Sequence, residues 1–334
     1  SVTGSNYLLE TGAVRILVDC GIFQGSDIAE IRNYESFPYD PPTITAVFLT
    51  HSHAAHTGRL PKLFKEGFRG ALYATPPTLD MTAIALPDNL SLMTDQAKKY
   101  NHPPLFSADD LNGIMNLAHG IEYGQEINLG PGVTAILHDA GHILGSSFIE
   151  IRAEGKRIFF SGDLGNPPTP LLKSFEYPTG ADYIVIESAY GNRIHEGRSE
   201  RKEKLRSIVK DTVTRGGVLM IPSFAMERTQ ELLFELNEMR NAGEIPEVPM
   251  FLDSPLAIKL TEIYQKYPNY FNAEASAQVR AGDDLFNFSG LQYMRTSQES
   301  KHINDIPAPK IIIAGSGMSN GGRILHHERR YLSN

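Results

Sequence analysis

The sequence predicts an α/β protein with two domains, and three observations support this prediction. The first half reads as short strands with a few helices, whereas the second half alternates strands with helices. Strands that alternate with helices predict a parallel sheet with crossover connections. The third observation is the length, because a chain of 334 residues is long enough for two domains of roughly 150 residues each.

Short strands dominate the first half of the chain, which we expect to form one domain over residues 1–185. Two alternating segments, Asn6–Glu10 and Val14–Asp19, flank Thr11-Gly12 and predict a hairpin. Thr45–Thr50 is rich in β-branched and apolar residues, which predicts a buried strand. We expect helices over 58–66, 78–99 and 108–119, and further strands over 133–138, 147–151, 157–161 and 182–187.

The second half, residues 186–334, is expected to form the other α/β domain, with the boundary near 182–190. The polar stretch Gly282–Asp305 reads as a long surface connection. The segments on either side of it show the hydrophobic patterns of helices and strands. We expect helices over 199–214, 226–241 and 255–267 and from 322 onward, and strands over 217–221, 249–252 and 310–314.

The composition limits the cellular setting and the partners. The net charge of −8 argues against a surface coated with basic residues for non-specific binding to nucleic acid. No apolar run approaches the ~20 residues that a membrane span needs. The single cysteine, Cys20, cannot form an internal disulfide, which indicates a reducing compartment such as the cytoplasm. Because Cys20 lies in an apolar stretch, we expect it to pack in the core.

The histidine cluster is the sharpest feature of the sequence. His51 and His53 lie two residues apart in a loop after a strand, so both imidazoles can converge on one metal ion. His56 lies at or just before the next predicted helix and can turn toward a second ion. An expression tag would be terminal and contiguous, and this cluster is neither. The pattern therefore indicates a metal-binding loop.

Two later segments add ligand types that complete such a site. His142 lies in a glycine-flanked turn after one predicted strand, and Asp163 lies just beyond another. A carboxylate can bridge two cations and hold them about 3.5–4 Å apart, as in two-metal hydrolases. Asp19 also ends a strand. It either orients a metal-bound histidine from behind or caps a turn.

Motifs along almost the whole chain carry a resemblance to a known family. In the first half they are LVDCGIFQG (17–25), THSHAAHTGRLP (50–61), AGHILGSS (140–147), FSGDLGN (160–166) and IESAYGNR (186–193). In the second half they are IPSFAMERTQELL (221–233), DSPLA (253–257) and GSGMSNGGRILHH (315–327). The chain resembles the metallo-β-lactamase superfamily and, within it, the β-CASP nucleases. The resemblance implies an αββα sandwich with an inserted α/β β-CASP domain.

The resemblance also implies an activity, which is zinc-dependent hydrolysis of phosphodiester bonds in RNA. Two Zn²⁺ ions are implied, and Glu187 would be an acidic residue that supports the metal-site histidines. The implied ligands are His51, His53 and His142 for one zinc, His56 for the other, and Asp163 between them.

The glycine-rich run 315–323 follows a predicted strand and precedes a predicted helix. Backbone N–H groups in such a turn can cradle a phosphate, and Arg323 can add a charge-assisted contact. The alternative is an ordinary tight turn. With the resemblance, we expect Ser316, Gly317 and Arg323 to contact the substrate.

One position departs from the family pattern H-x-H-x-D-H. Ala55 stands where the pattern has an aspartate that ligates the second metal and holds the attacking water. A methyl group can do neither, so we expect the chain as written to be inactive or severely impaired. The other ligands of this region are intact, which favours a single inactivating substitution over a decayed site.

The family pattern also extends beyond both ends of this sequence. A first strand would precede Ser1–Ser5, and two histidine motifs would follow Tyr331–Asn334, the second of which would supply a ligand to the second metal. We therefore expect either a fragment or a site completed by another chain. A homodimer is a further expectation, by analogy with prokaryotic relatives.

Three other functions remain open at this point. A non-catalytic RNA-binding or scaffold subunit agrees with Ala55, but the retained ligands oppose it. A DNA nuclease of the same family shares the same metal loop. A small-molecule hydrolase of the glyoxalase or lactonase kind is opposed by residues 187–334, because such enzymes lack a comparable insertion.

Overall fold

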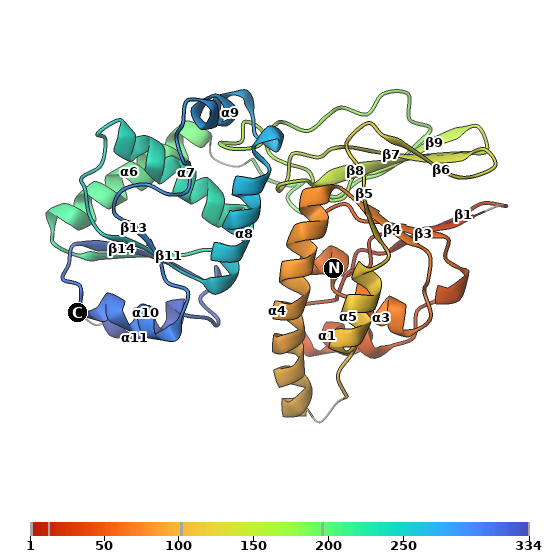
Figure 1. The fold of residues 1–334 in the computed structure, drawn as a ribbon, viewed down its shortest axis with the longest axis horizontal. Helices are drawn as coiled ribbons and strands as arrows, with labels where there is room; N and C mark the ends of the chain where they lie inside the picture. Colours follow the sequence, from red (N-terminus) through yellow and green to blue (C-terminus); the bar gives the residue numbers. More distant parts are fainter. Residues whose placement is uncertain (1–2, 13, 101–102, 195–196, 333–334) are drawn as a thin grey trace. The chain divides into compact units, whose positions relative to one another are not determined.

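The computed structural model describes residues 3–12, 14–100, 103–194 and 197–332. These residues form two compact units (Figure 1). Unit 1 comprises Ser1–Pro167 with Ser174–Gly191, and unit 2 comprises Pro168–Lys173 with Asn192–Asn334.

The division between the units lies slightly later in the chain than the expected one between residues 185 and 186. The chain stays in unit 1 beyond residue 185 because the backbone N–H of Glu187 donates to Ser161 Oγ at 2.9 Å. The short segment 168–173 belongs to unit 2 because Asn272 donates its backbone N–H to Leu171 O at 2.9 Å. Neither long-range contact has a signal in the local sequence pattern.

The first sheet of unit 1 consists of β1 (Tyr7–Glu10), β2 (Arg15–Val18), β3 (Ala46–Phe48), β4 (Ala71–Ala74) and β5 (Ala118–Gly120). The strands lie in chain order, and only β1 and β2 are antiparallel. This antiparallel pair confirms the predicted hairpin, although Ala13 in its turn lies outside the described residues. The sequence pattern missed β4 and β5, which are too short to show a period.

The second sheet of unit 1 consists of β6 (Glu126–Gly130), β7 (Val133–Asp139), β8 (Ser147–Ala153), β9 (Lys156–Phe160) and β10 (Tyr183–Val185). Its order is β10-β9-β8-β7-β6. Strands β6 to β9 form an antiparallel meander, and β10 adds to β9 in parallel.

The main core of unit 1 lies between the two sheets, which face each other. It is built from alternate residues of the strands, among them Ile16, Val18, Phe48, Leu137, Ile149 and Ile151. The opposite face of the first sheet packs on α3 (Leu60–Lys65) and α5 (Ala108–Met115). Two facing sheets, with helices on the outer face of the first, agree with the predicted fold class. The other helices of this unit are α1 (Asp27–Ile31), α2 (Ala54–Thr57) and α4 (Pro76–Tyr100).

Unit 2 is built on a parallel sheet of order β11-β14-β12-β13, which confirms the sheet predicted from the alternating pattern. Its strands are β11 (Val218–Pro222), β12 (Met250–Asp253), β13 (Leu291–Tyr293) and β14 (Lys310–Ala314). Its helices are α6 (Arg198–Thr214), α7 (Arg228–Asn241), α8 (Pro255–Lys266), α9 (Ala273–Arg280), α10 (Ser297–His302) and α11 (Ile324–Tyr331).

The expectation of a long surface connection over Gly282–Asp305 is wrong. The stretch contains β13 and α10, and Phe286 and Ile303 are buried. A capping box starts α10, in which Thr296 and Glu299 each accept a hydrogen bond from the other's backbone N–H. Polar residues outnumber apolar ones in this stretch. Its composition therefore gave no sign of a strand and helices of only three to six residues.

Cys20 is fully buried in the cluster that also contains Leu17 and Val47, as expected for a core residue. Burial raises the pKa of its thiol to about 12, so the thiol stays protonated. Among the helices that the structure describes, none combines the length and the apolar character needed to cross a membrane.

The outer face of the second sheet carries a buried carboxylate with three partners. Glu150 on β8 is 1% exposed and accepts hydrogen bonds from Arg152 Nε at 2.7 Å and Arg157 Nε at 2.8 Å. Its other oxygen pairs with His138 Nε2 at 2.9 Å. Burial raises the pKa of Glu150, but these hydrogen bonds outweigh burial and lower it to about 2.

Replacement of this carboxylate is expected to destabilise unit 1. Glu150→Gln should lower the free energy of unfolding in urea by about 1–3 kcal/mol near neutral pH, because the charge-assisted bonds are lost. A depressed pKa stabilises the fold above the unfolded value of 4.5, and this stabilisation is lost as the pH falls toward 2. The difference between parent and variant should therefore shrink in that pH window. The matched control is Glu126→Gln, which removes a half-exposed partner of Arg152. An equal effect in both variants would contradict the prediction.

Candidate metal centre

The ends of four strands bring the predicted ligands together at one edge of unit 1. Strands β2 and β3 are parallel, so their carboxyl ends share an edge, and Asp19 and His51 follow them. Strands β7 and β9 run in the same direction because each is antiparallel to β8. The turns after β7 and β9 carry His142 and Asp163.

Close backbone contacts hold the histidine loop in place. The N–H groups of Cys20 and Ile22 donate to the carbonyls of His56 at 2.7 Å and Ala54 at 3.0 Å. Gly21 between them has no side chain, and a Cβ there would lie 1.5 Å from the carbonyl oxygen of Ala55. A glycine is therefore required for the segment after β2 to pack against the short helix α2.

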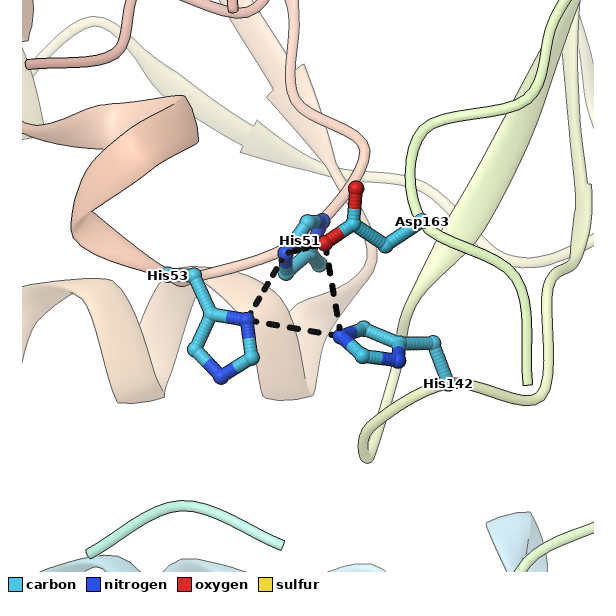
Figure 2. Close-up of side chains that lie close together, drawn as sticks. All are labelled: His51, His53, His142 and Asp163. Carbon is cyan, nitrogen blue, oxygen red and sulfur yellow. Dashed lines mark hydrogen bonds and ion pairs between the residues drawn. The ribbon is translucent and has the colours of Figure 1, made fainter. Parts of the chain in front are cut away.

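Three imidazoles and one carboxylate converge on a common point (Figure 2). His53 Nδ1 lies 3.0 Å from His51 Nε2 and 3.4 Å from His142 Nε2. Asp163 Oδ2 lies 3.7 Å from the Nε2 atoms of both His51 and His142. All four ligand atoms lie within 4.8 Å of one another. Tetrahedral bonds of about 2.0–2.1 Å place ligand atoms roughly 3.3 Å apart. The separations of 3.0, 3.4 and 3.7 Å lie near this value, so we call these four residues the tetrahedral set.

The electrostatics of these histidines suit metal binding. Burial and then the neighbouring imidazoles hold the pKa of His51 well below its usual value. Burial and the neighbouring His142 lower the pKa of His53 to about 3, although Asp163 opposes them. Burial also lowers the pKa of His142. All three imidazoles are therefore neutral near neutral pH, and the neutral form is the one that binds metal.

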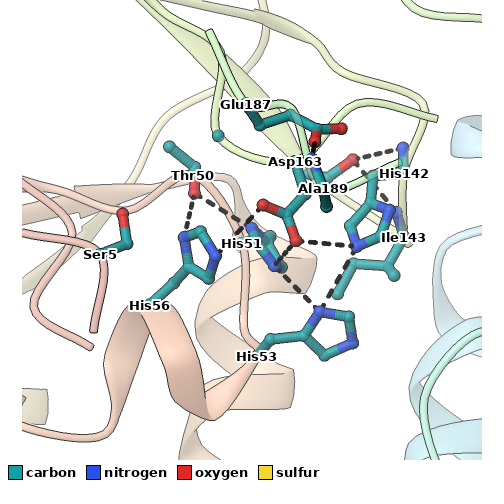
Figure 3. Close-up of polar contacts among 12 residues, drawn as sticks. Ser5, Thr50, His51, His53, His56, His142, Ile143, Asp163, Glu187 and Ala189 are labelled. Atoms are coloured by element: carbon teal, nitrogen blue, oxygen red, sulfur yellow. Dashed lines mark hydrogen bonds and ion pairs between the residues drawn. The ribbon is translucent and has the colours of Figure 1, made fainter. Parts of the chain in front are cut away.

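Asp163 links this set to His56 (Figure 3). Its Oδ2 belongs to the tetrahedral set, whereas its Oδ1 lies 3.3 Å from His56 Nε2. One carboxylate therefore offers one oxygen to each of two neighbouring positions. Burial raises the pKa of Asp163, but the hydrogen bond and charge of His56 outweigh it and lower the pKa.

Asp19 lies behind His56. Its Oδ2 is 2.6 Å from His56 Nδ1, which leaves the Nε2 atom directed at Asp163. Burial lowers the pKa of His56, but the two carboxylates outweigh burial and raise it to about 10. Asp19 is itself fully buried and has a φ of 61°, a left-handed conformation in which aspartate is several-fold enriched. The carboxylate thus fixes the ring orientation of a candidate ligand.

Two further residues at this site were not predicted from the sequence. Thr50 donates its backbone N–H to Asp19 Oδ1 at 2.8 Å, and its hydroxyl lies 3.0 Å from His51 Nδ1. Ser5 donates its hydroxyl to Asp19 Oδ2 at 3.0 Å. Thr50 directly precedes the first histidine, so its place in the loop was the available hint. Ser5 is distant in sequence and offered none.

Glu187 contacts the loop that carries Asp163. Its carboxylate accepts hydrogen bonds from the backbone N–H groups of Ala189 at 2.8 Å and Leu164 at 3.5 Å (Figure 3). Its charge also raises the pKa of His142, although burial dominates there. Glu187 therefore braces the neighbourhood of the ligands through the backbone.

Ala55 lies in α2 between His53 and His56, and its carbonyl accepts a hydrogen bond from Ser5 N at 2.9 Å. Its side chain is a methyl group and provides no ligand atom. The position beside His56 Nε2 and Asp163 Oδ1 is therefore poorer in donor atoms than the tetrahedral set.

In unit 2, the expected substrate residues lie in the turn between β14 and α11. Ser316 donates its hydroxyl to Asn320 at 2.7 Å, and Gly317 packs against Phe224. Arg323 points inward and donates to Asp253 Oδ1 at 2.6 Å, because that fully buried carboxylate needs a counter-charge. Contact of Arg323 with a phosphate therefore stays a prediction, although Asp253 already holds one of its guanidinium nitrogens. The sequence reading did not foresee the pairing with Asp253.

Comparisons with known proteins agree with this geometry. Residues 8–172 match the family described as the metallo-beta-lactamase superfamily domain, and residues 229–334 match the Beta-Casp domain. Ribonuclease TTHA0252 of Thermus thermophilus is 39% identical over 99% of this chain and 74% of its own length. The transcription termination factor FttA of Methanosarcina mazei is 31% identical over 98% of this chain and 52% of its own length. This chain thus spans about half of that factor.

One solved structure extends the comparison at the level of the fold. A crystal structure of a protein of unknown function from Enterococcus faecalis superposes with a TM-score of 0.53. The match covers 96% of this chain and 76% of that one, at 11% identity. At this identity the likeness concerns the fold alone.

Removal of the Asp19 charge is expected to lower the pKa of His56. In the metal-free protein, Asp19→Asn should bring this pKa down from about 10, because one of the two carboxylates that outweigh the effect of burial is then uncharged. The measurement is an NMR titration of the His56 imidazole. Asp182→Asn removes a surface carboxylate that pairs with Lys156 and should leave this pKa unchanged. A pKa that stays near 10 in Asp19→Asn would show that Asp163 alone sets it.

Proposed function

Because this chain belongs to the β-CASP group of the metallo-β-lactamase superfamily, we propose that its scaffold hydrolyses RNA phosphodiester bonds with two zinc ions. We further propose that Ala55 leaves the chain as written inactive or severely impaired. The observation that carries the proposal is the convergence of His51, His53, His142 and Asp163 in a chain that is 39% identical to a ribonuclease.

The donor set supports zinc as the metal. Neutral imidazole and carboxylate are preferred zinc ligands, and the four donor atoms have tetrahedral spacing. His51, His53 and His142 would hold one ion, His56 the other, and Asp163 would bridge them. Bound zinc lowers the pKa of a coordinated water and stabilises negative charge on the reacting phosphate.

The protein's own groups keep these ligands in position and in the right protonation state. Asp19 fixes the ring of His56 through its Nδ1 atom, so that Nε2 faces Asp163. Glu187 braces the loop after β9 through two backbone N–H groups. His56 carries a proton in the metal-free protein near neutral pH because its pKa is raised to about 10. It must release that proton to ligate a metal.

Ala55 divides the two metal positions into a strong one and a weak one. The tetrahedral set does not involve residue 55, so the first ion should bind well. The second position lacks the carboxylate that the family pattern supplies there. The attacking water also loses the group that would hold it and accept its proton. We therefore infer occupancy of one zinc and little or no turnover.

RNA as the substrate is supported by a relative named as a ribonuclease and by others named as termination factors. The second candidate function is a non-catalytic RNA-binding role, and Ala55 is the observation that favours it. A DNA nuclease of the same family remains an alternative. Unit 2 disfavours a small-molecule hydrolase, since it provides a whole α/β domain that such an enzyme does not need. Homodimerisation stays a proposal by analogy.

Restoration of the missing carboxylate tests the proposed function. Ala55→Asp should cleave single-stranded RNA at least about a hundredfold faster than the parent chain, the size of one well-placed acid–base group. The matched control is Ala54→Asp, which adds the same charge one residue earlier on α2. Both variants are made in the 334-residue chain and in the same chain extended by any sequence that follows it in the gene.

The choice of substrates separates the alternatives. Cleavage rates on single-stranded RNA, single-stranded DNA and a lactone are compared, with bound zinc measured in each sample. Preferential cleavage of RNA by Ala55→Asp, but not by Ala54→Asp, supports the proposal. RNA binding without cleavage in zinc-loaded Ala55→Asp would favour the non-catalytic role. Preferential cleavage of DNA or of the lactone would show that this compound, and not RNA, is the substrate.

A further inference from the structure

The carboxyl edge of the unit 2 sheet presents two exposed apolar side chains that the metal chemistry does not use. Strands β11 and β14 are adjacent and parallel, so the segments that follow them leave the sheet side by side. In open α/β sheets, ligands bind outside the carboxyl ends of the strands. The segment after β11 carries Phe224, and the segment after β14 carries Met318.

Phe224 is the exception among the phenylalanines. The chain has 16 of them, all in the described residues, and Phe224 is the one that is exposed, at 54% of its surface. Met318 on the neighbouring segment is 69% exposed. Two large apolar side chains are thus exposed at the carboxyl edge of the unit 2 sheet, where open α/β sheets commonly bind ligands.

Hydrogen bonds hold the backbone of the Phe224 segment in place. Its carbonyl accepts a hydrogen bond from the buried Thr229 hydroxyl at 2.6 Å. Ser223 N donates to Ala314 O at 3.0 Å, which ties the segment to β14. A Cβ at Gly317 would lie 2.8 Å from Cδ2 of the Phe224 ring. The absence of a side chain at Gly317 therefore lets the β14 turn support the ring.

Arg323, the charged residue of the glycine-rich run 315–323, points inward. Arg323 is bound to the buried Asp253 and also donates to Met294 O at 2.9 Å. The Ser316 hydroxyl is occupied by Asn320. The edge therefore offers an exposed aromatic ring next to small polar groups. This combination suits the flat face of a base better than the charge of a phosphate.

We propose that Phe224, together with Met318, is a stacking platform for an unpaired base of the RNA. This inference rests on the proposed function and deepens it, because it names the part of the substrate that unit 2 recognises. Proteins that bind single strands commonly stack bases on aromatic side chains, which tolerates any sequence because every base has a π-face.

The chain contains no tryptophan, which allows a direct spectroscopic test. Phe224→Trp introduces a single indole at the platform, and a stacked base should quench its fluorescence. The matched control is Ile208→Trp, which places the indole at another exposed position of unit 2, on α6. Each variant of the 334-residue chain is titrated with a single-stranded RNA 5′-labelled for anisotropy, and with the same backbone lacking its bases.

The expected result is quenching by RNA in Phe224→Trp, none in Ile208→Trp, and none with the abasic strand. Phe224→Ala should weaken RNA binding about 5- to 150-fold, the size of one stacked base, and Phe224→Tyr should preserve it. RNA binding by anisotropy without quenching would overturn the platform and leave the proposed function standing. Absence of RNA binding in the parent chain would overturn both. Unchanged affinity in Phe224→Ala would also contradict the platform.

Discussion

One buried carboxylate, that of Asp19, holds together the parts of unit 1 that form the metal centre. Ser5 and Thr50 donate to it, and His56 pairs with it, so three separate segments meet at a fully buried charge. Such a charge without partners would cost several kcal/mol. The segments are therefore bound to one arrangement, and that arrangement directs His56 toward Asp163.

Asp163 connects the ligand atoms in a similar way. Its two oxygens serve two positions, one formed by three neutral imidazoles and one formed by a protonated His56. In the metal-free protein, the proton on His56 takes the place of a cation between two carboxylates. On the proposed function, a metal at the second position would displace that proton, whereas a metal at the first would displace none. Ala55 would then withhold a ligand from the position where binding is already harder.

Sequence reasoning found most of the metal centre because its chemistry is local. His51, His53, His142 and Asp163 each follow a strand, and strand ends at a common edge meet in space. The partners of these ligands come from distant segments and small hydroxyls, so Ser5 and Thr50 were missed. The parallel sheet of unit 2 was predictable from its alternating pattern. The elements within 282–305 were not, because they are short and polar residues surround their few buried side chains.

X-ray absorption at the zinc edge, on the chain loaded with one equivalent of zinc, tests the tetrahedral set most directly. We expect three imidazoles and an oxygen ligand at about 2.0–2.1 Å from the metal. His142→Ala should reduce the number of imidazoles to two, while replacement of the exposed His119 on β5 by alanine should leave it at three. An imidazole number of one, or a number that His142→Ala does not change, would contradict the account.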